Sequence, residues 1–198
     1  MSAKRTSDKR TLVTIPTGRL VLRDLESKDL GAVHDYSSDP EVVRYMDWGP
    51  NTDEDDKKFL ERALAARKEN PRRNFTLAIV LKDTNKLIGS CGIHEPNPVD
   101  REGWIGYCLN RRYWRQGFGT ETAKGLVNFG FNSLGLHRIF ATCMPANTAS
   151  AHVLEKTGMQ LEGCLRQHRR VKGKWRDSLV YAILDQEWQN QRKPTNVR

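Results

Sequence analysis

Residues 114–125, WRQGFGTETAKG, have the residue types and the spacing that could hold an anion. Gly117 and Gly119 stand where a helical pattern begins, and the first backbone N–H groups of a helix have no partner within the helix. These donors would come from the stretch between Arg115 and Thr120. The alternative is that the two glycines only allow a tight turn between a strand and the helix. The absence of a Cβ at Gly117, where a ligand would approach the backbone, and the nearby arginines favour the anion site.

Two common nucleotide-binding motifs are excluded by the residues themselves. A phosphate-binding P-loop requires Gly-Lys-Ser/Thr after four spacer residues, and the sequence contains no such run. A dinucleotide fold requires a third glycine where Thr122 stands. The anion is therefore expected to be held by backbone donors in another type of site.

The elements around this stretch alternate between strand and helix patterns. Strands are expected at 19–23, 74–81, 87–94, 103–109, 137–143, 159–165 and 175–184, and helices start near 27, 52, 117 and 147. The passage from 103 to 143 reads as strand, helix, strand, which implies a parallel pair joined by a crossover. The other neighbouring strands follow one another as hairpins, which implies antiparallel pairing.

The predicted fold class is therefore mixed α/β (α+β), with a mostly antiparallel twisted sheet, a central splayed parallel strand pair and helices on both faces. We expect a flexible basic leader over residues 1–14, a single domain over 15–188 and a C-terminal tail over 189–198. No linker rich in proline, glycine or serine divides the chain.

Composition indicates a protein with an anionic partner and no membrane span. The 198 residues carry a net charge of +9, and no window approaches the roughly 20 apolar residues that a span requires. The N-terminus has no apolar segment behind its charges, so we expect a cytoplasmic protein. The four cysteines form no C-x-x-C pair and are expected to be reduced core residues, with no metal site. Part of the charge lies at 166–176, which fits either a solvated hairpin or a surface facing an anion.

Two motifs together resemble a known superfamily. W-x-x-G-x-G-T-E, at 114–121, is followed by P-x-N-x-x-S-x-x-V-L-E-K-x-G-M, at 145–159. In this order and spacing they are similar to the GNAT superfamily of acyl-CoA N-acyltransferases, in particular the RimJ/RimL-like branch, and the likeness extends from Arg19 to Leu184. The superfamily usually has Gln or Arg at the position of Trp114, a difference that leaves the backbone donors intact.

The resemblance implies acetyl-CoA as donor and assigns residues to it. Asn147 would hydrogen-bond the pantetheine arm, or would serve only as a helix N-cap. Ser150 would protonate the leaving thiolate, directly or through water, which is a modest demand because a thiol pKa lies near about 8.5. The pyrophosphate would be held by Arg115, Gln116, Gly117, Phe118, Gly119 and Thr120, and the pantetheine arm would pair with the strand end around Cys108 and Leu109.

The general base does not carry over from the family. Arg169 stands where the branch has a glutamate. The remaining candidates are Glu102, Glu162 and Asp177, each of which could also be a plain surface acid. We expect Glu102, at the mouth of the central strand, to act through water.

The acceptor is expected to be a primary amine, either a protein N-terminus or a small molecule, attacking directly in a ternary complex. Trp48 and Tyr107 would wall its pocket, together with Tyr45 and Trp104, although each could instead pack in the core. A basic 166–176 hairpin would repel polyamines. The alternatives are an acetyltransferase that detoxifies an antibiotic or antimetabolite, and a non-catalytic acyl-CoA-binding regulator. No motif for specific nucleic-acid recognition is present, and a monomer or homodimer is expected.

Overall fold

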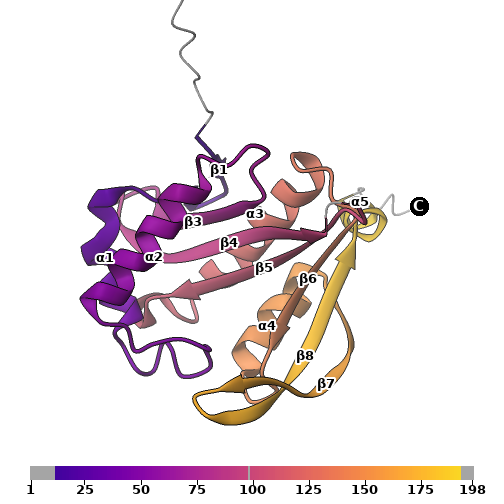
Figure 1. The fold of residues 1–198 in the computed structure, drawn as a ribbon. Coiled ribbons are helices and arrows are strands. Elements are labelled where there is room, and N and C mark those ends of the chain that lie inside the picture. Colours follow the sequence, from indigo (N-terminus) through magenta and orange to yellow (C-terminus); the bar gives the residue numbers. More distant parts are fainter. Residues whose placement is uncertain (1–11, 98, 193–198) are drawn as a thin grey trace, which may run out of the picture.

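One sheet organises the chain in the computed structural model, which describes residues 12–97 and 99–192. Its strands run in the order β1-β2-β3-β4-β5-β6-β8-β7 (Figure 1). They are β1 (Thr14–Pro16), β2 (Leu20–Asp24), β3 (Asn74–Leu81), β4 (Leu87–Asn97), β5 (Glu102–Leu109), β6 (Arg138–Cys143), β7 (Gln160–Val171) and β8 (Lys174–Leu184). The helices are α1 (Leu30–Ser37), α2 (Asp53–Ala66), α3 (Phe118–Asn132), α4 (Thr148–Thr157) and α5 (Asp185–Arg192).

Strands β5 and β6 form the parallel pair that the strand-helix-strand pattern predicts. Their register contains three pairs, the last of which joins Trp104 to Phe140. All the other neighbouring strands in the sheet run antiparallel. Beyond Trp104 the two strands diverge, so the sheet opens into a V (Figure 1). The predicted mixed sheet with one splayed parallel pair is confirmed, and the strands part after Trp104.

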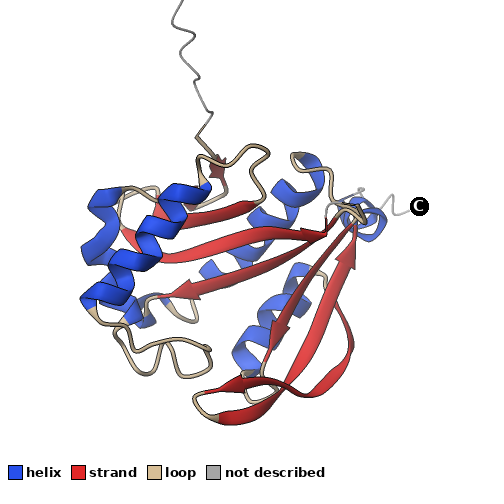
Figure 2. Ribbon diagram, in the orientation of Figure 1, coloured by secondary structure: helices blue, strands red, loops and turns tan. Residues whose placement is uncertain are grey.

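Helices cover both faces of the sheet, as predicted (Figure 2). Strand β3 shows why, because its run NFTLAIVL is apolar on both sides. Leu77 and Ile79 belong to the core beneath α3 and α4, and Ala78 and Val80 belong to the core beneath α1 and α2. The α3–α4 side and the α1–α2 side are therefore two separate apolar layers on one sheet.

The predicted boundaries of the domain differ from the observed elements at both ends. Residues 1–11 of the predicted leader lie outside the described residues, and Thr14, the last residue of that leader, is the first residue of β1. The predicted tail begins at 189, but α5 continues to Arg192 and the Gln191 side chain donates to the Gly158 carbonyl at 3.3 Å. The hairpin of β7 and β8 extends to Val171 and Lys174, beyond the predicted end of its first strand at 165, because pairing resumes at Arg169, opposite Arg176, after an interruption in the register.

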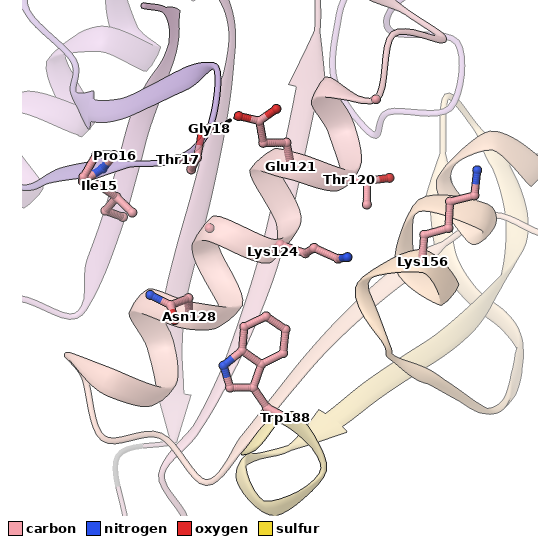
Figure 3. Close-up of a pocket in the computed structure, with 12 residues that line it drawn as sticks. Ile15, Pro16, Thr17, Gly18, Thr120, Glu121, Lys124, Asn128, Lys156 and Trp188 are labelled. Atoms are coloured by element: carbon pink, nitrogen blue, oxygen red, sulfur yellow. Dashed lines mark hydrogen bonds between the residues drawn. The ribbon is translucent and has the colours of Figure 1, made fainter. Parts of the chain in front are cut away.

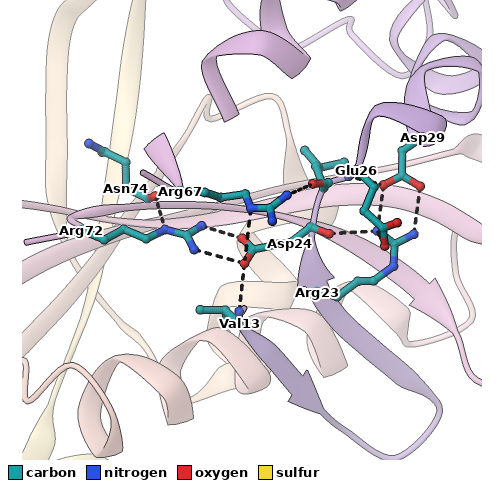
Figure 4. Close-up of polar contacts among 9 residues, drawn as sticks. Val13, Arg23, Asp24, Glu26, Asp29, Arg67, Arg72 and Asn74 are labelled. Carbon is teal, nitrogen blue, oxygen red and sulfur yellow. Dashed lines mark hydrogen bonds and ion pairs between the residues drawn. The ribbon is translucent and has the colours of Figure 1, made fainter. Parts of the chain in front are cut away.

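A buried carboxylate fixes the start of the domain. Asp24 is 4% exposed and accepts hydrogen bonds from both terminal nitrogens of Arg72, at 2.6 and 3.2 Å. The Val13 N–H donates to the same carboxylate at 2.9 Å, and Arg67 lies 4.0 Å away (Figure 4). This cluster joins β2 to the segments before it and to the entry of β3. Of the part of the chain that the structure describes, no helix is long and apolar enough to cross a bilayer.

A second carboxylate joins the β1–β2 turn to the first turn of α3. Glu121 accepts hydrogen bonds from the Thr17 hydroxyl at 2.7 Å, the Arg19 N–H at 2.6 Å and the Arg19 Nε at 2.9 Å. Burial alone would raise the pKa of Glu121, but these donors outweigh it and hold the pKa below its usual value of 4.5. The start of α3 is therefore held against β2 by an ionised side chain.

Replacing Glu121 by glutamine should lower the melting temperature at pH 7 by about 2–4 °C, because a charge-assisted hydrogen bond exceeds a neutral one by about 1 kcal/mol. A carboxylate with a lowered folded-state pKa stabilises the fold above the unfolded pKa of 4.5 and loses that effect as the pH falls through the folded value. The difference in melting temperature between the wild type and Glu121→Gln should therefore disappear once the pH is below the folded-state pKa of Glu121.

The control is Glu54→Gln, because Glu54 is exposed and lies 3.5 Å from Lys58. It should leave the melting temperature within about 1 °C of the wild type at both pH values, as expected for a surface pair. A pH-independent difference for Glu121→Gln would contradict the assigned role of the charge.

Candidate functional site

The glycine turn is a loop of unpaired backbone donors. A 3-10 turn, Arg111–Tyr113, follows β5, and the chain then takes left-handed conformations at Arg115 (φ 59°) and Gly117 (φ 83°) before α3 begins. Among the described residues, no acceptor is found for the backbone N–H groups from Arg115 to Thr120; the first to be paired is that of Glu121, to the Gly117 carbonyl. Such a run of N–H groups at a helix start binds an anion.

Side chains fix this loop from outside. The Trp114 indole N–H donates to the Leu109 carbonyl at 2.8 Å, and Arg19 donates to the Gln116 carbonyl at 3.0 Å. The Arg19 guanidinium also lies 4.2 Å from the centre of the Phe118 ring, which is buried. Sequence reasoning assigned no role to the Trp114 side chain, but here it ties the loop to the end of β5.

The end of β5 presents backbone groups to the gap beside it. The Asn110 N–H donates to Ile88 of β4, and residues of a strand alternate between neighbours, so Cys108 faces β4 while Tyr107 and Leu109 face β6. The Leu109 carbonyl is already taken by Trp114. Among the described residues, β6 offers no partner to the Tyr107 N–H and carbonyl or to the Leu109 N–H, which face the gap. The sequence expectation named Cys108 and Leu109; the structure places Cys108 against β4, and burial raises the pKa of its thiol to about 12.

Ser150 and Asn147 meet the end of β5 from α4. Asn147 accepts a hydrogen bond from the Ser150 N–H at 3.2 Å, which is the N-cap arrangement. The Ser150 hydroxyl lies 3.2 Å from the Tyr107 hydroxyl. Burial raises the pKa of Tyr107, so its phenol is neutral and can donate. Tyr107 was expected to wall the acceptor pocket; it also contacts Ser150 on the α4 side of the sheet.

Glu102 lies at the opposite end of β5. Its carboxylate accepts from Arg138 at 2.9 Å, and Arg138 in turn is bound at 2.6 Å by both oxygens of Glu162. Asp177, the remaining candidate, accepts the Gln167 N–H within the hairpin. Glu102 starts the strand whose far end carries the opening, and within the described residues none of the three carboxylates is hydrogen-bonded to Ser150. We therefore do not retain Glu102 as the base.

A cleft of about 960 Å³ opens on the α1–α2 side of the gap. The loop between α1 and α2, the diverging ends of β5 and β6, and the β7–β8 hairpin enclose it. Arg169 contacts Asp47 at 3.1 Å and Lys172 donates to the Val43 carbonyl at 3.0 Å, so the hairpin and the loop touch across it. Its aromatic walls include Trp48, as expected, together with Tyr45, Phe59, Trp104 and Phe140.

A second, shallower cavity of about 630 Å³ lies beside α3. Gly117 and Thr120 of the glycine loop line it together with Lys124 and Lys156, and the two lysines come from α3 and α4 (Figure 3). Two positive side chains, one on each helix, therefore lie in the same cavity as the glycine loop. No group of histidine, cysteine, aspartate or glutamate side chains suited to a metal ion occurs within residues 12–97 and 99–192.

Comparisons with known proteins agree with this geometry. The family model "Acetyltransferase (GNAT) domain" matches residues 19–160, which is more than half of the chain. The chain is 34% identical over 175 residues to the "Uncharacterized N-acetyltransferase p20" of Bacillus licheniformis, covering 88% of this chain and 98% of that protein.

Two solved structures share the fold. The GNAT-family acetyltransferase of Bacillus anthracis superposes with a TM-score of 0.78 at 34% identity, over 88% of this chain and 99% of that one. RimJ of Mycobacterium smegmatis in complex with CoA-disulfide superposes with a TM-score of 0.77 at 25% identity, over 89% and 88%. The chain therefore belongs to the GNAT acetyltransferase family and is an acyltransferase that uses acetyl-CoA.

Proposed function

We propose that the protein transfers the acetyl group of acetyl-CoA to a primary amine by direct attack in a ternary complex. The observation that carries the proposal is the juxtaposition of three features at one place. The glycine loop offers unpaired N–H groups, the β5 edge offers unpaired backbone, and the Ser150 hydroxyl lies 3.2 Å from the hydroxyl of Tyr107, a residue of that edge which also lines the cleft.

The donor would lie on the α3–α4 side. The pyrophosphate of CoA matches the converging N–H groups of residues 115–120, and Lys124 and Lys156 add positive charge for its other phosphate. The pantetheine amides match the open groups of Tyr107 and Leu109, so the arm would extend the sheet as an additional strand. This arrangement would deliver the thioester to the point where β5 and β6 part.

The acceptor would enter from the cleft on the other side. Its amine nitrogen attacks the thioester carbonyl carbon, the new C–N bond forms and the C–S bond breaks. The departing thiolate takes a proton from the Ser150 hydroxyl, which the Tyr107 phenol at 3.2 Å replenishes through their hydrogen bond, and water in the cleft that Tyr107 lines returns a proton to the phenol. A thiol pKa of about 8.5 makes this a modest demand on the acid.

The charges around the cleft bear on the class of amine. Lys58, Arg62, Arg169 and Arg176 line it, opposite Asp47, Asp55 and Asp56, and Asp47 is paired with Arg169. Because the cationic side chains outnumber the carboxylates, the lining disfavours a polycation, and we propose an acceptor with one amine and neutral or acidic groups, such as a protein N-terminus or an amino-acid-like small molecule. A drug or antimetabolite amine of that kind fits the same description.

Replacing Gly117 by alanine should weaken acetyl-CoA binding about tenfold. An alanine at this position would have to adopt a φ of +83°, which side chains rarely tolerate, and its Cβ would lie 3.3 Å from an Arg19 nitrogen. The resulting shift of the backbone would distort the N–H groups that hold the phosphates. The matched control is Gly135→Ala, where φ is +67° and no atom lies within 4 Å of the added Cβ. Titration calorimetry should show the loss for Gly117→Ala only; unchanged affinity in both variants would contradict a phosphate site at the loop.

Replacing Ser150 by alanine should lower kcat by about 10²-fold while the KM for acetyl-CoA stays within about twofold, because the hydroxyl acts when the C–S bond breaks. Thiol release should be followed with peptides bearing free N-termini, amino-acid analogues, aminoglycosides and spermidine. Ser133→Ala, at the exposed end of α3, is the control. Binding of acetyl-CoA without thiol release with any amine would favour a regulator, and absence of any acetyl-CoA binding would overturn the proposal.

A further inference from the structure

The carboxylates that line the cleft are already engaged. Asp47 is paired with Arg169, and Asp55 accepts hydrogen bonds from the backbone and hydroxyl of Thr52 at the start of α2. Asp56 is fully buried and accepts hydrogen bonds from Ser37, Asn51 and His34. Asp56 is engaged through both oxygens, and Asp47 and Asp55 are each held through Oδ2 by a partner at the rim of the cleft or at the start of α2.

His94 of β4 has the geometry of a base instead. Its ring stacks on Trp104 of β5, with ring centres 4.3 Å apart. Its Nδ1 lies 3.0 Å from the Asn74 Oδ1, and because an amide oxygen can only accept, this contact is a hydrogen bond in the tautomer that carries the proton on Nδ1. The Nε2 atom is then the unprotonated nitrogen, with its lone pair directed away from Asn74. The stack and the hydrogen bond together fix both the orientation and the tautomer of the ring.

The Nε2 atom faces a stretch of sheet that carries no side chains. A Cβ built on Gly92 would lie 2.6 Å from Nε2, so the nitrogen lies directly over this glycine. Gly106 is the register partner of Gly92 on β5, and the next residue, Tyr107, faces the gap where the strands part. His94, Gly92 and Gly106 all line the cleft. Within the described part of the chain Nε2 has no hydrogen-bond partner, so a substrate amine or a water is free to occupy that position.

The surroundings keep the ring neutral. Burial lowers the pKa of His94 below its usual value of 6.5 and is the one cause of the shift. Neighbours on β3 and β5, Asn74 and Trp104, are uncharged. The charged groups that face the cleft from α2 and the hairpin are Lys58, Arg62, Arg169 and Arg176, opposed by the paired Asp47, Asp55 and Asp56.

We propose that His94 is the general base of the acetyl transfer, with Asn74 as the residue that positions it. This inference rests on the proposed function. As the C–N bond forms, the amine nitrogen becomes cationic and its proton acidic; Nε2 accepts that proton, directly or through one water, and gives it up to solvent through the cleft. The electron pair of the breaking C–S bond stays on sulfur, which Ser150 protonates, so one proton leaves the amine and one reaches the thiolate.

The test is His94→Gln assayed with acetyl-CoA and the best amine from the acceptor panel. The variant should lower kcat by about 10²-fold or more and leave the dissociation constant of acetyl-CoA within about twofold. In the wild type kcat at saturating amine should fall on the acid side with an apparent pKa below about 6.5, because the base must be neutral in the bound complex, and this limb should be absent in the variant. His137→Gln, a histidine 42% exposed at the start of β6, should behave as the wild type. A His94→Gln enzyme within twofold of wild-type kcat overturns the proposal.

A second measurement does not depend on turnover, so it remains informative even if His94→Gln also disturbs the stacking on Trp104. Nitrogen-15 NMR of the wild-type imidazole should show His94 with Nδ1 protonated and Nε2 bare at pH 7, and Asn74→Ala should mix the tautomers and lower kcat while the KM for the amine changes little. An Nε2-protonated ring in the wild type overturns the proposal whatever the activity. Wild-type protein that binds no acetyl-CoA would instead indicate that the proposed function itself is wrong.

Discussion

The separation of β5 from β6 is the constraint on which the rest of the structure depends. The two strands share three register pairs and then part, so backbone groups in the middle of a sheet lose the neighbour that would otherwise pair them. Unpaired backbone at such a position is costly unless something else pairs with it. The opening is maintained because each strand keeps a complete partner on its other side, β4 for β5 and β8 for β6. A substrate arm with amide groups can hydrogen-bond the backbone groups of β5 that β6 leaves unpaired.

The sequence predicts those elements whose apolar residues recur with the period of a strand or a helix. Strand and helix patterns repeat, so β3, α3 and α4 were placed to within a residue or two and the parallel pair followed from their order. The glycine and Asn/Ser motifs resembled a family and gave the donor. The exposed half of the β7–β8 hairpin carries charged side chains with no apolar period, so its length could not be predicted.

The change of the proposed base from Glu102 to His94 has a different origin. Glu102 and Leu109 stand at opposite ends of one strand, and ligands bind beyond the carboxyl ends of parallel strands, so the topology alone argues against Glu102 at the amino end. His94 gave no periodic signal, because one histidine at the end of an apolar run resembles a core residue. What reveals it is a cross-strand relation between Gly92 and Gly106, and registers of this kind are not visible until the strands are paired.

Burial gives the polar groups of the site a common character. The same loss of hydration raises the pKa of the Tyr107 phenol and the Cys108 thiol and lowers that of the His94 imidazole. All three shifts favour the uncharged form, so these groups are neutral before the reaction begins. The Arg169–Asp47 ion pair lies at the rim, where both side chains face solvent.

The alternation of side chains along β5 allows one strand to serve both substrates. Trp104 and Gly106 face the cleft on the α1–α2 side, while Ile105 and Tyr107 face α3 and α4. If the register of β5 shifted by one residue, these faces would be exchanged. The Tyr107 ring would then lie on the cleft side, where Gly106 now lies, and its hydroxyl would no longer contact Ser150. The Asn110 bond to Ile88 and the Trp114 bond to Leu109 hold the strand at its open end, where no β6 partner fixes the register. The side chain of Trp114, outside the run of phosphate donors, therefore secures the geometry on both sides of the sheet.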